Sequence, residues 1–88
     1  MTTKRILLDQ ASQGRGPLGK AKDDEPVFLL VGDDLFAPGF VELWAAALSQ
    51  TTVGRKRTND EMLKILDAQM IATEMRKWQT KHGAKVPD

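Results

Sequence analysis

Residues 26–31 form the most uniformly apolar stretch of this 88-residue chain. The stretch, Pro-Val-Phe-Leu-Leu-Val, places apolar side chains on both alternating faces, which predicts a strand covered on two sides. A lone strand leaves backbone groups without partners. We therefore expect it to pair with a short N-terminal strand around Ile6–Leu8, or with the same strand of a second chain.

The segment Pro38–Ser49 has helical spacing. It follows the turn Gly32–Asp34, and Pro38 suits the first turn of a helix, where its missing N–H needs no partner. At 100° per residue one stripe of this segment is apolar, which predicts one buried face. The stripe contains Phe40, Val41, Leu43, Trp44, Ala47 and Leu48, and Glu42, Ala45 and Ser49 lie opposite.

A longer helix is predicted over Asn59–Lys81. Thr58 and Glu61 have the spacing of a capping box, and Gly83 is a natural stop. The apolar residues of this helix fall on two faces: Met62, Leu63, Ile65, Leu66, Met70 and Ala72 on one, and Ala68, Ile71, Met75 and Trp78 on the other. So small a chain cannot cover this surface, which favours self-association; the alternative is a single chain whose long helix curls over the strand and first helix.

Together these elements predict one small α+β domain at residues 26–88. Residues 1–25 are predicted to be a flexible, basic and Gly-rich arm, because most of them have little apolar surface to bury. Residues 26–54 carry three acidic and no basic residues, whereas residues 55–88 carry eight basic and five acidic ones. An anion-binding surface is therefore expected in the C-terminal part.

The composition narrows the classes of function. The chain has no cysteine, which excludes disulfides and thiolate chemistry and fits a cytoplasmic protein. Its longest apolar stretch is far shorter than the ~20 residues of a membrane-spanning helix, so no membrane partner is expected.

The segment Gly14–Lys20 matches two phosphate-binding patterns, GxxxxGK and GxGxxG. A P-loop needs a hydroxyl residue after the lysine, where this chain has Ala21, and residues 22–26 do not begin a helix. We interpret the match as part of the arm.

Acidic residues and histidine offer no catalytic constellation. We interpret Asp33, Asp34 and Glu42 as turn, cap and surface residues, and the sole histidine, His82, has no partner at useful spacing. The sequence therefore predicts no catalytic residue, no metal, no cofactor and no enzyme activity.

The basic loop before the long helix carries the most suggestive chemistry. A helix N-terminus with adjacent arginines favours a phosphate. The predicted ligand-binding residues are Arg55, Lys56, Arg57, Thr58 and Asn59, with Trp44 and Trp78 as stacking platforms for a base. The alternatives are a solvated loop balanced by neighbouring acids, and tryptophans in a core or interface. The connection is too long for a helix-turn-helix, so specific binding to duplex DNA is not expected.

Four segments between residues 25 and 88, Glu25-Pro-Val-Phe-Leu-Leu-Val-Gly-Asp-Asp34, Phe36-Ala-Pro38, Val41-Glu-Leu-Trp44 and Met75-Arg-Lys-Trp78, resemble a group of short, uncharacterised phage and prophage proteins. The resemblance implies a phage context, in which compact accessory proteins antagonise host defence by binding a defence protein or sequestering a nucleotide signal.

These observations predict a small homo-oligomeric binding protein, of the phage counter-defence type, that sequesters a small phosphorylated, nucleotide-type ligand in the host cytoplasm. One alternative is a protein that antagonises a host defence enzyme by direct contact. Another is a nonspecific nucleic-acid binder that uses the arm and the basic loop, whose affinity would fall steeply with salt.

Overall fold

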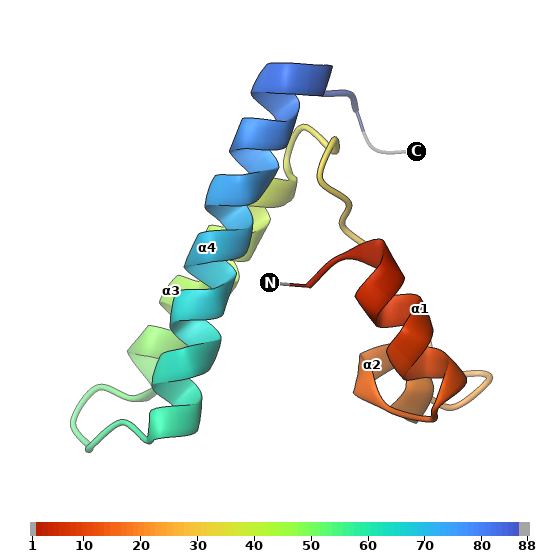
Figure 1. Ribbon diagram of the computed structural model, residues 1–88. Helices are drawn as coiled ribbons and strands as arrows, with labels where there is room; N and C mark the ends of the chain where they lie inside the picture. The colour runs from red at the N-terminus through yellow and green to blue at the C-terminus, as the bar shows by residue number, and fades with distance from the viewer. Residues whose placement is uncertain (1, 87–88) are drawn as a thin grey trace.

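The computed structural model describes residues 2–86 and consists of helices joined by irregular segments (Figure 1). The helices are α1 (Lys4–Ser12), α2 (Gly16–Lys20), α3 (Ala37–Thr51) and α4 (Asn59–His82). They form two pairs, because α1 packs on α2 and α3 packs on α4, and within residues 2–86 no helix of one pair contacts a helix of the other. The radius of gyration is 14.4 Å, above the roughly 12 Å of a compact chain of this length.

The predicted α+β fold is wrong. Residues 2–86 contain no strand, and their only β-type pairing is an isolated parallel bridge between Asp34 and Lys85. The predicted N-terminal strand is helical because the Thr3 hydroxyl accepts the Ile6 N–H at 3.3 Å and α1 contains neither glycine nor proline. Without that partner, residues 26–31 remain an irregular linker in which Phe28 is 81% exposed.

Part of the segment predicted as an arm forms the first helix pair. The chain turns between α1 and α2 at Gly14 and Gly16, which have positive φ angles of 68° and 71°. A Cβ at Gly19 would lie 2.6 Å from the Gly14 carbonyl carbon, so this contact requires glycine. No residue of Lys4–Ser12 or Gly16–Lys20 is buried, and Met1 lies outside the described residues.

Both predicted helices of the C-terminal part are confirmed, and they form the antiparallel α3–α4 hairpin (Figure 1). The capping box is present: the Thr58 hydroxyl accepts the Glu61 N–H at 3.1 Å, and the Glu61 carboxylate accepts the Thr58 N–H at 3.0 Å. α4 ends where the Gly83 N–H donates to the Gln79 carbonyl at 2.8 Å.

The hairpin closes along an inner seam of mostly small side chains. Ala45 of α3 packs against Ile65 and Ala68 of α4, with Val41 and Leu48 of α3 partly buried beside them. Ala72 of α4 and Ala37 of α3 are also buried. Small side chains allow two helices to approach closely.

This seam corrects the predicted buried face of α3. Ala45, predicted to lie opposite the buried stripe, is 3% exposed, whereas Phe40, Leu43 and Trp44 are exposed. Both faces of α3 are apolar, and α4 packs on the one with smaller side chains. On α4 the buried residues come from both predicted faces. The predicted surplus of apolar surface on α4 is confirmed, since Met62, Leu63, Leu66, Met70 and Trp78 remain exposed.

The last turn before α3 is fixed to the C-terminal end of α4. The Gln79 side-chain amide donates to the carbonyl oxygens of Gly32 (3.1 Å) and Asp34 (2.8 Å). The Lys85 N–H donates to the Asp33 carbonyl at 2.8 Å. These contacts position the start of α3. None of the helices in residues 2–86 combines the length and apolar character needed to cross a lipid bilayer.

Candidate functional site

Arg55, in the loop between α3 and α4, is engaged by the chain itself. Its guanidinium donates two hydrogen bonds to the Glu61 carboxylate, at 2.9 and 2.6 Å. Arg55, together with the N–H of Thr58, lowers the pKa of the Glu61 carboxyl to about 2, and Glu61 in turn raises the pKa of Arg55. Glu61 is therefore the acidic neighbour that balances the charge of Arg55, as in the alternative interpretation of this loop.

Arg57 contacts the C-terminal end of the other helix of the hairpin, α3. Its guanidinium donates to the Ser49 hydroxyl at 2.9 Å and to the buried Thr52 hydroxyl at 3.0 Å. These residues lie at the C-terminal end of α3, where the helix dipole favours a cation. Arg57 therefore has a structural role at this end of the hairpin.

The N-terminus of α4 already holds an anion. The Glu61 carboxylate accepts the Thr58 N–H, and the Thr58 hydroxyl accepts the Glu61 N–H. Thr58, which was predicted to contact a phosphate, therefore uses both of these groups in the capping box. Lys56 and Asn59 are exposed beside them.

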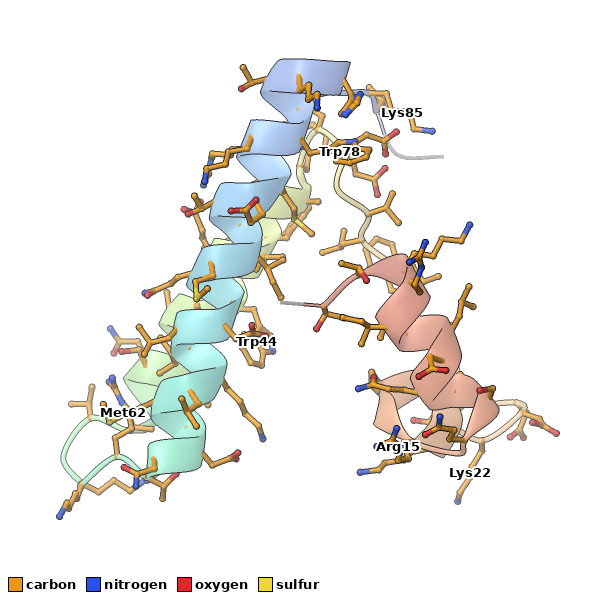
Figure 2. All side chains as sticks on the ribbon, viewed as in Figure 1. Arg15, Lys22, Trp44, Met62, Trp78 and Lys85 are labelled. Carbon is orange, nitrogen blue, oxygen red and sulfur yellow. The ribbon has the colours of Figure 1, made fainter. Side chains whose placement is uncertain are left out.

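The two tryptophans lie away from this loop (Figure 2). Trp78 is 20 positions along α4 from Thr58, roughly 30 Å at a helical rise of ~1.5 Å per residue. Its ring lies beside that of His82, with centroids 4.1 Å apart, and a Cβ added at Gly32 would lie 3.7 Å from it. Trp44 is half-exposed in the middle of α3. The structure thus gathers Arg55, Arg57 and Thr58 but not the base platforms, and the phosphate site stays a prediction.

The acidic residues are distributed among separate contacts. The Asp34 carboxylate is buried and accepts the Val31 N–H at 3.1 Å, so it closes the turn but does not cap α3. Asp33 lies 3.9 Å from the Lys85 ammonium. Glu42 accepts hydrogen bonds from Arg76 of α4, one of them at 2.7 Å, and these bonds lower the pKa of Glu42.

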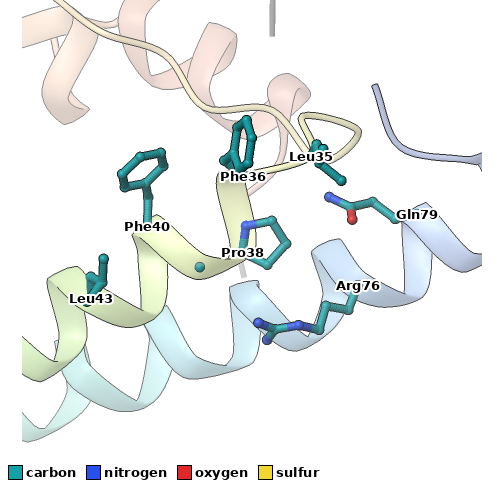
Figure 3. Close-up of a pocket in the computed structure, with 8 residues that line it drawn as sticks. Leu35, Phe36, Pro38, Phe40, Leu43, Arg76 and Gln79 are labelled. Atoms are coloured by element: carbon teal, nitrogen blue, oxygen red, sulfur yellow. The ribbon is translucent and has the colours of Figure 1, made fainter. Parts of the chain in front are cut away.

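The outward face of α3 is a feature most of whose apolar residues were predicted to be buried but are exposed. We call it the α3 outer stripe; its residues are Phe36, Phe40, Leu43 and Ala47. Phe36 and Phe40 are just over half exposed and Leu43 is 65% exposed, with Trp44 at the edge of the stripe. Figure 3 shows Phe36, Phe40 and Leu43 projecting from the side of α3 that faces away from α4.

An open hollow adjoins this stripe. Its volume is about 500 Å³, and it lies between the N-terminal half of α3 and the C-terminal half of α4. Phe36, Phe40 and Leu43 contribute the apolar part, and Arg76 and Gln79 contribute polar groups from α4 (Figure 3). Because both polar side chains are held by hydrogen bonds, the hollow is suited to apolar contact.

A second apolar surface lies on α4, at the end of the hairpin near the loop, where Figure 2 labels Met62. We call it the α4 patch; its residues are Met62, Leu63, Leu66 and Met70, all exposed. At 100° per residue they span about 100° of the helix surface. The same flank continues as Thr73 and Lys77, so the apolar surface ends halfway along α4.

Comparisons with known proteins show no relative: no protein-family model, no curated protein and no solved structure matches the chain.

Proposed function

We propose that this chain is a non-enzymatic, oligomeric protein-binding module that acts through the apolar surfaces of its α3–α4 hairpin. The observation that supports this proposal is the division of apolar side chains in the hairpin. Ala45, Ala68 and Ala72 are buried in the inner seam, while the larger side chains of the α3 outer stripe and the α4 patch are exposed. Large contiguous apolar surfaces of this kind mark sites of protein contact.

The α4 patch is the surface that we assign to a partner protein. Methionine and leucine side chains are flexible and adapt to a partner's shape, and methionine is common at protein-binding surfaces. The patch lies on a helix anchored at both ends, by the capping box and by the Gln79 contacts with the turn before α3. In the phage context that the sequence resemblance implies, the partner would be a host protein.

Direct contact with a protein is better supported than the predicted phosphorylated ligand. The two arginines predicted to bind phosphate already donate to Glu61, Ser49 and Thr52. A phosphate would have to displace these contacts before binding.

Co-purification with matched variants tests the proposal. Tagged wild-type chain expressed in host cells should retain one protein at a fixed ratio, and Leu66→Glu should lose it, because a charge would be buried in the contact. Thr73→Glu is the control, since it adds the same charge on the same flank one heptad away, and it should retain the protein. Circular dichroism should show equal helix content in all three chains. Equal retention by Leu66→Glu, or no retained protein with wild type, would overturn the assignment of the α4 patch.

A further inference from the structure

The α3 outer stripe has the spacing of a helix–helix seam. Its residues are separated by four, three and four positions, the repeat by which neighbouring helices pack in bundles. The inner face of α3, which packs on α4, has the same spacing. The inner positions are Val41, Ala45, Leu48 and Thr52. α3 therefore has the pattern of a helix with two neighbours, and α4 is one of them.

Within residues 2–86, no second helix of the chain packs on the stripe, because α1 contacts only α2. We propose that the missing neighbour is α3 of another copy of this chain, packed antiparallel across a two-fold axis that passes between Phe40 and Leu43. The spacing of four, three and four reads the same in both directions, which is what an antiparallel pair of identical helices requires.

Side-chain sizes along the stripe match this arrangement. With the axis between Phe40 and Leu43, Phe36 lies opposite the partner subunit's Ala47, and Phe40 lies opposite the partner subunit's Leu43. Each aromatic ring thus meets a smaller side chain, as tight packing between helices requires. A parallel pair in register would instead place Phe36 against the partner subunit's Phe36, crowding one end and leaving a gap at the alanines.

The charges permit two copies of the stripe to meet. Glu42 is the single ionised residue of α3, and Arg76 of the same chain neutralises it. Two identical faces therefore approach without the like-charge repulsion that opposes many self-contacts.

The area of the stripe is also adequate for a dimer. An aromatic side chain has roughly 150 to 250 Å² to bury. Phe36, Phe40 and Trp44 are each just over half exposed and Leu43 is more so, which gives roughly 400 Å² of apolar surface per copy. A standard interface of ~800 Å² per partner is a little over half apolar. The stripe and Trp44 therefore supply most of the apolar area that a stable dimer needs.

This inference rests on the oligomeric part of the proposed function and is independent of the α4 patch. Loss of the partner protein in Leu66→Glu leaves the pairing of α3 untouched, and loss of pairing leaves the assignment of the α4 patch to be judged by its own experiment.

Photo-crosslinking of the purified full chain tests the pairing. p-Benzoylphenylalanine at position 36 keeps an aromatic ring there and reacts with C–H bonds close to it. Mixing heavy-isotope and unlabelled chains separates links between copies from links within one copy. Cleavage after Glu42 then places position 36 and Ala47 on different fragments, residues 26–42 and 43–61.

The expected product joins fragment 26–42 of one copy to fragment 43–61 of the other. Leu43→Lys in the same chain, which adds no cleavage site, should reduce its yield at least 10-fold at fixed concentration, because each pair buries two of these side chains. Ala46→Lys, on the flank of α3 outside the stripe, should keep the yield, and circular dichroism should show unchanged helix content in both. Links between two 26–42 fragments would overturn the antiparallel arrangement, and links only within one copy would overturn the pairing itself.

Discussion

α3 presents two apolar faces that differ in the size of their side chains and in what covers them. The inner face contacts α4 through Ala45, with Val41 and Leu48 partly buried, whereas the outer face carries Phe36, Phe40 and Leu43 in the open. Burying a Phe or Leu side chain stabilises a fold by roughly 1.5 to 3 kcal/mol, far more than burying a methyl group. The residues with most to gain from burial are thus the ones that the single chain leaves exposed. The inner face serves the hairpin, and we propose that the outer face serves an assembly.

The largest effect is expected at the inner seam. Ala72→Asp should unfold the hairpin, because an unpaired buried carboxylate costs several kcal/mol, comparable with the whole stability of a small domain. Circular dichroism should show most of the helix signal lost. Thr73→Asp, at the exposed neighbouring position, should keep it. A helical Ala72→Asp chain would show that the seam is not closed, and the contrast between the two faces would disappear.

At the outer face, the effect of a truncation should depend on protein concentration. Phe40→Ala should cost under about 1 kcal/mol in dilute chains, where the ring is already half-exposed, and about 3 kcal/mol at concentrations where copies pair. Urea unfolding at two protein concentrations measures both values. An equal cost at the two concentrations would mean that pairing does not cover Phe40.

The loop between the helices should show a smaller, purely local effect. Thr58→Ala removes one half of the capping box and should lower the free energy of unfolding by about 1 kcal/mol. Thr80→Ala is the matched control, because its hydroxyl bonds only the Arg76 carbonyl of its own helix, and it should change stability by less than about 0.5 kcal/mol. Urea unfolding compares them. Equal losses in the free energy of unfolding for the two variants would contradict the structural role that we give to Thr58.

The smallest effect is a pH dependence in the same loop. The folded chain lowers the pKa of Glu61 from 4.5 to about 2. Its stabilisation is therefore complete above about pH 4.5 and is lost as the pH falls toward 2. Glu61→Gln lacks this charge, so its melting temperature should lie below that of wild type at pH 6, and the difference should shrink in acid. A difference that stays constant from pH 6 to 2.5 would contradict the Arg55–Glu61 pairing.

The sequence predicted the hairpin well where the signals are local. Thr58 with Glu61 and the stop at Gly83 bounded α4, and Pro38 marked the first turn of α3. These signals depend on hydrogen bonds within a few residues, so no knowledge of the tertiary structure was needed.

The fold class could not be predicted because it depends on long-range pairing. Residues 26–31 have the composition of a buried strand, yet a strand needs a partner, and residues 6–8 were better satisfied in a helix capped by Thr3. The buried face of α3 was missed for a related reason. Both faces are apolar, and periodicity ranks faces by hydrophobicity, whereas the packing selected Ala45 because it allows α4 to come closest.

The candidate site could be predicted only in part from the sequence. The cluster of Arg55, Arg57 and Thr58 was found, but the sequence could not show that Glu61, Ser49 and Thr52 would occupy these groups. Phe40, Leu43 and Ala47 of the outer stripe were recognised as apolar from the sequence, but helical periodicity could not show that they stay exposed while Ala45 is buried.

The molecular mass in solution tests the central claim most directly. Sedimentation equilibrium of the wild-type chain should show a concentration-dependent rise from 9.8 kDa toward twice that mass, and Leu43→Glu should stay near 9.8 kDa over the same range. A wild-type chain that remains at 9.8 kDa up to hundreds of micromolar would contradict the account, because the outer face of α3 would then stay open in solution.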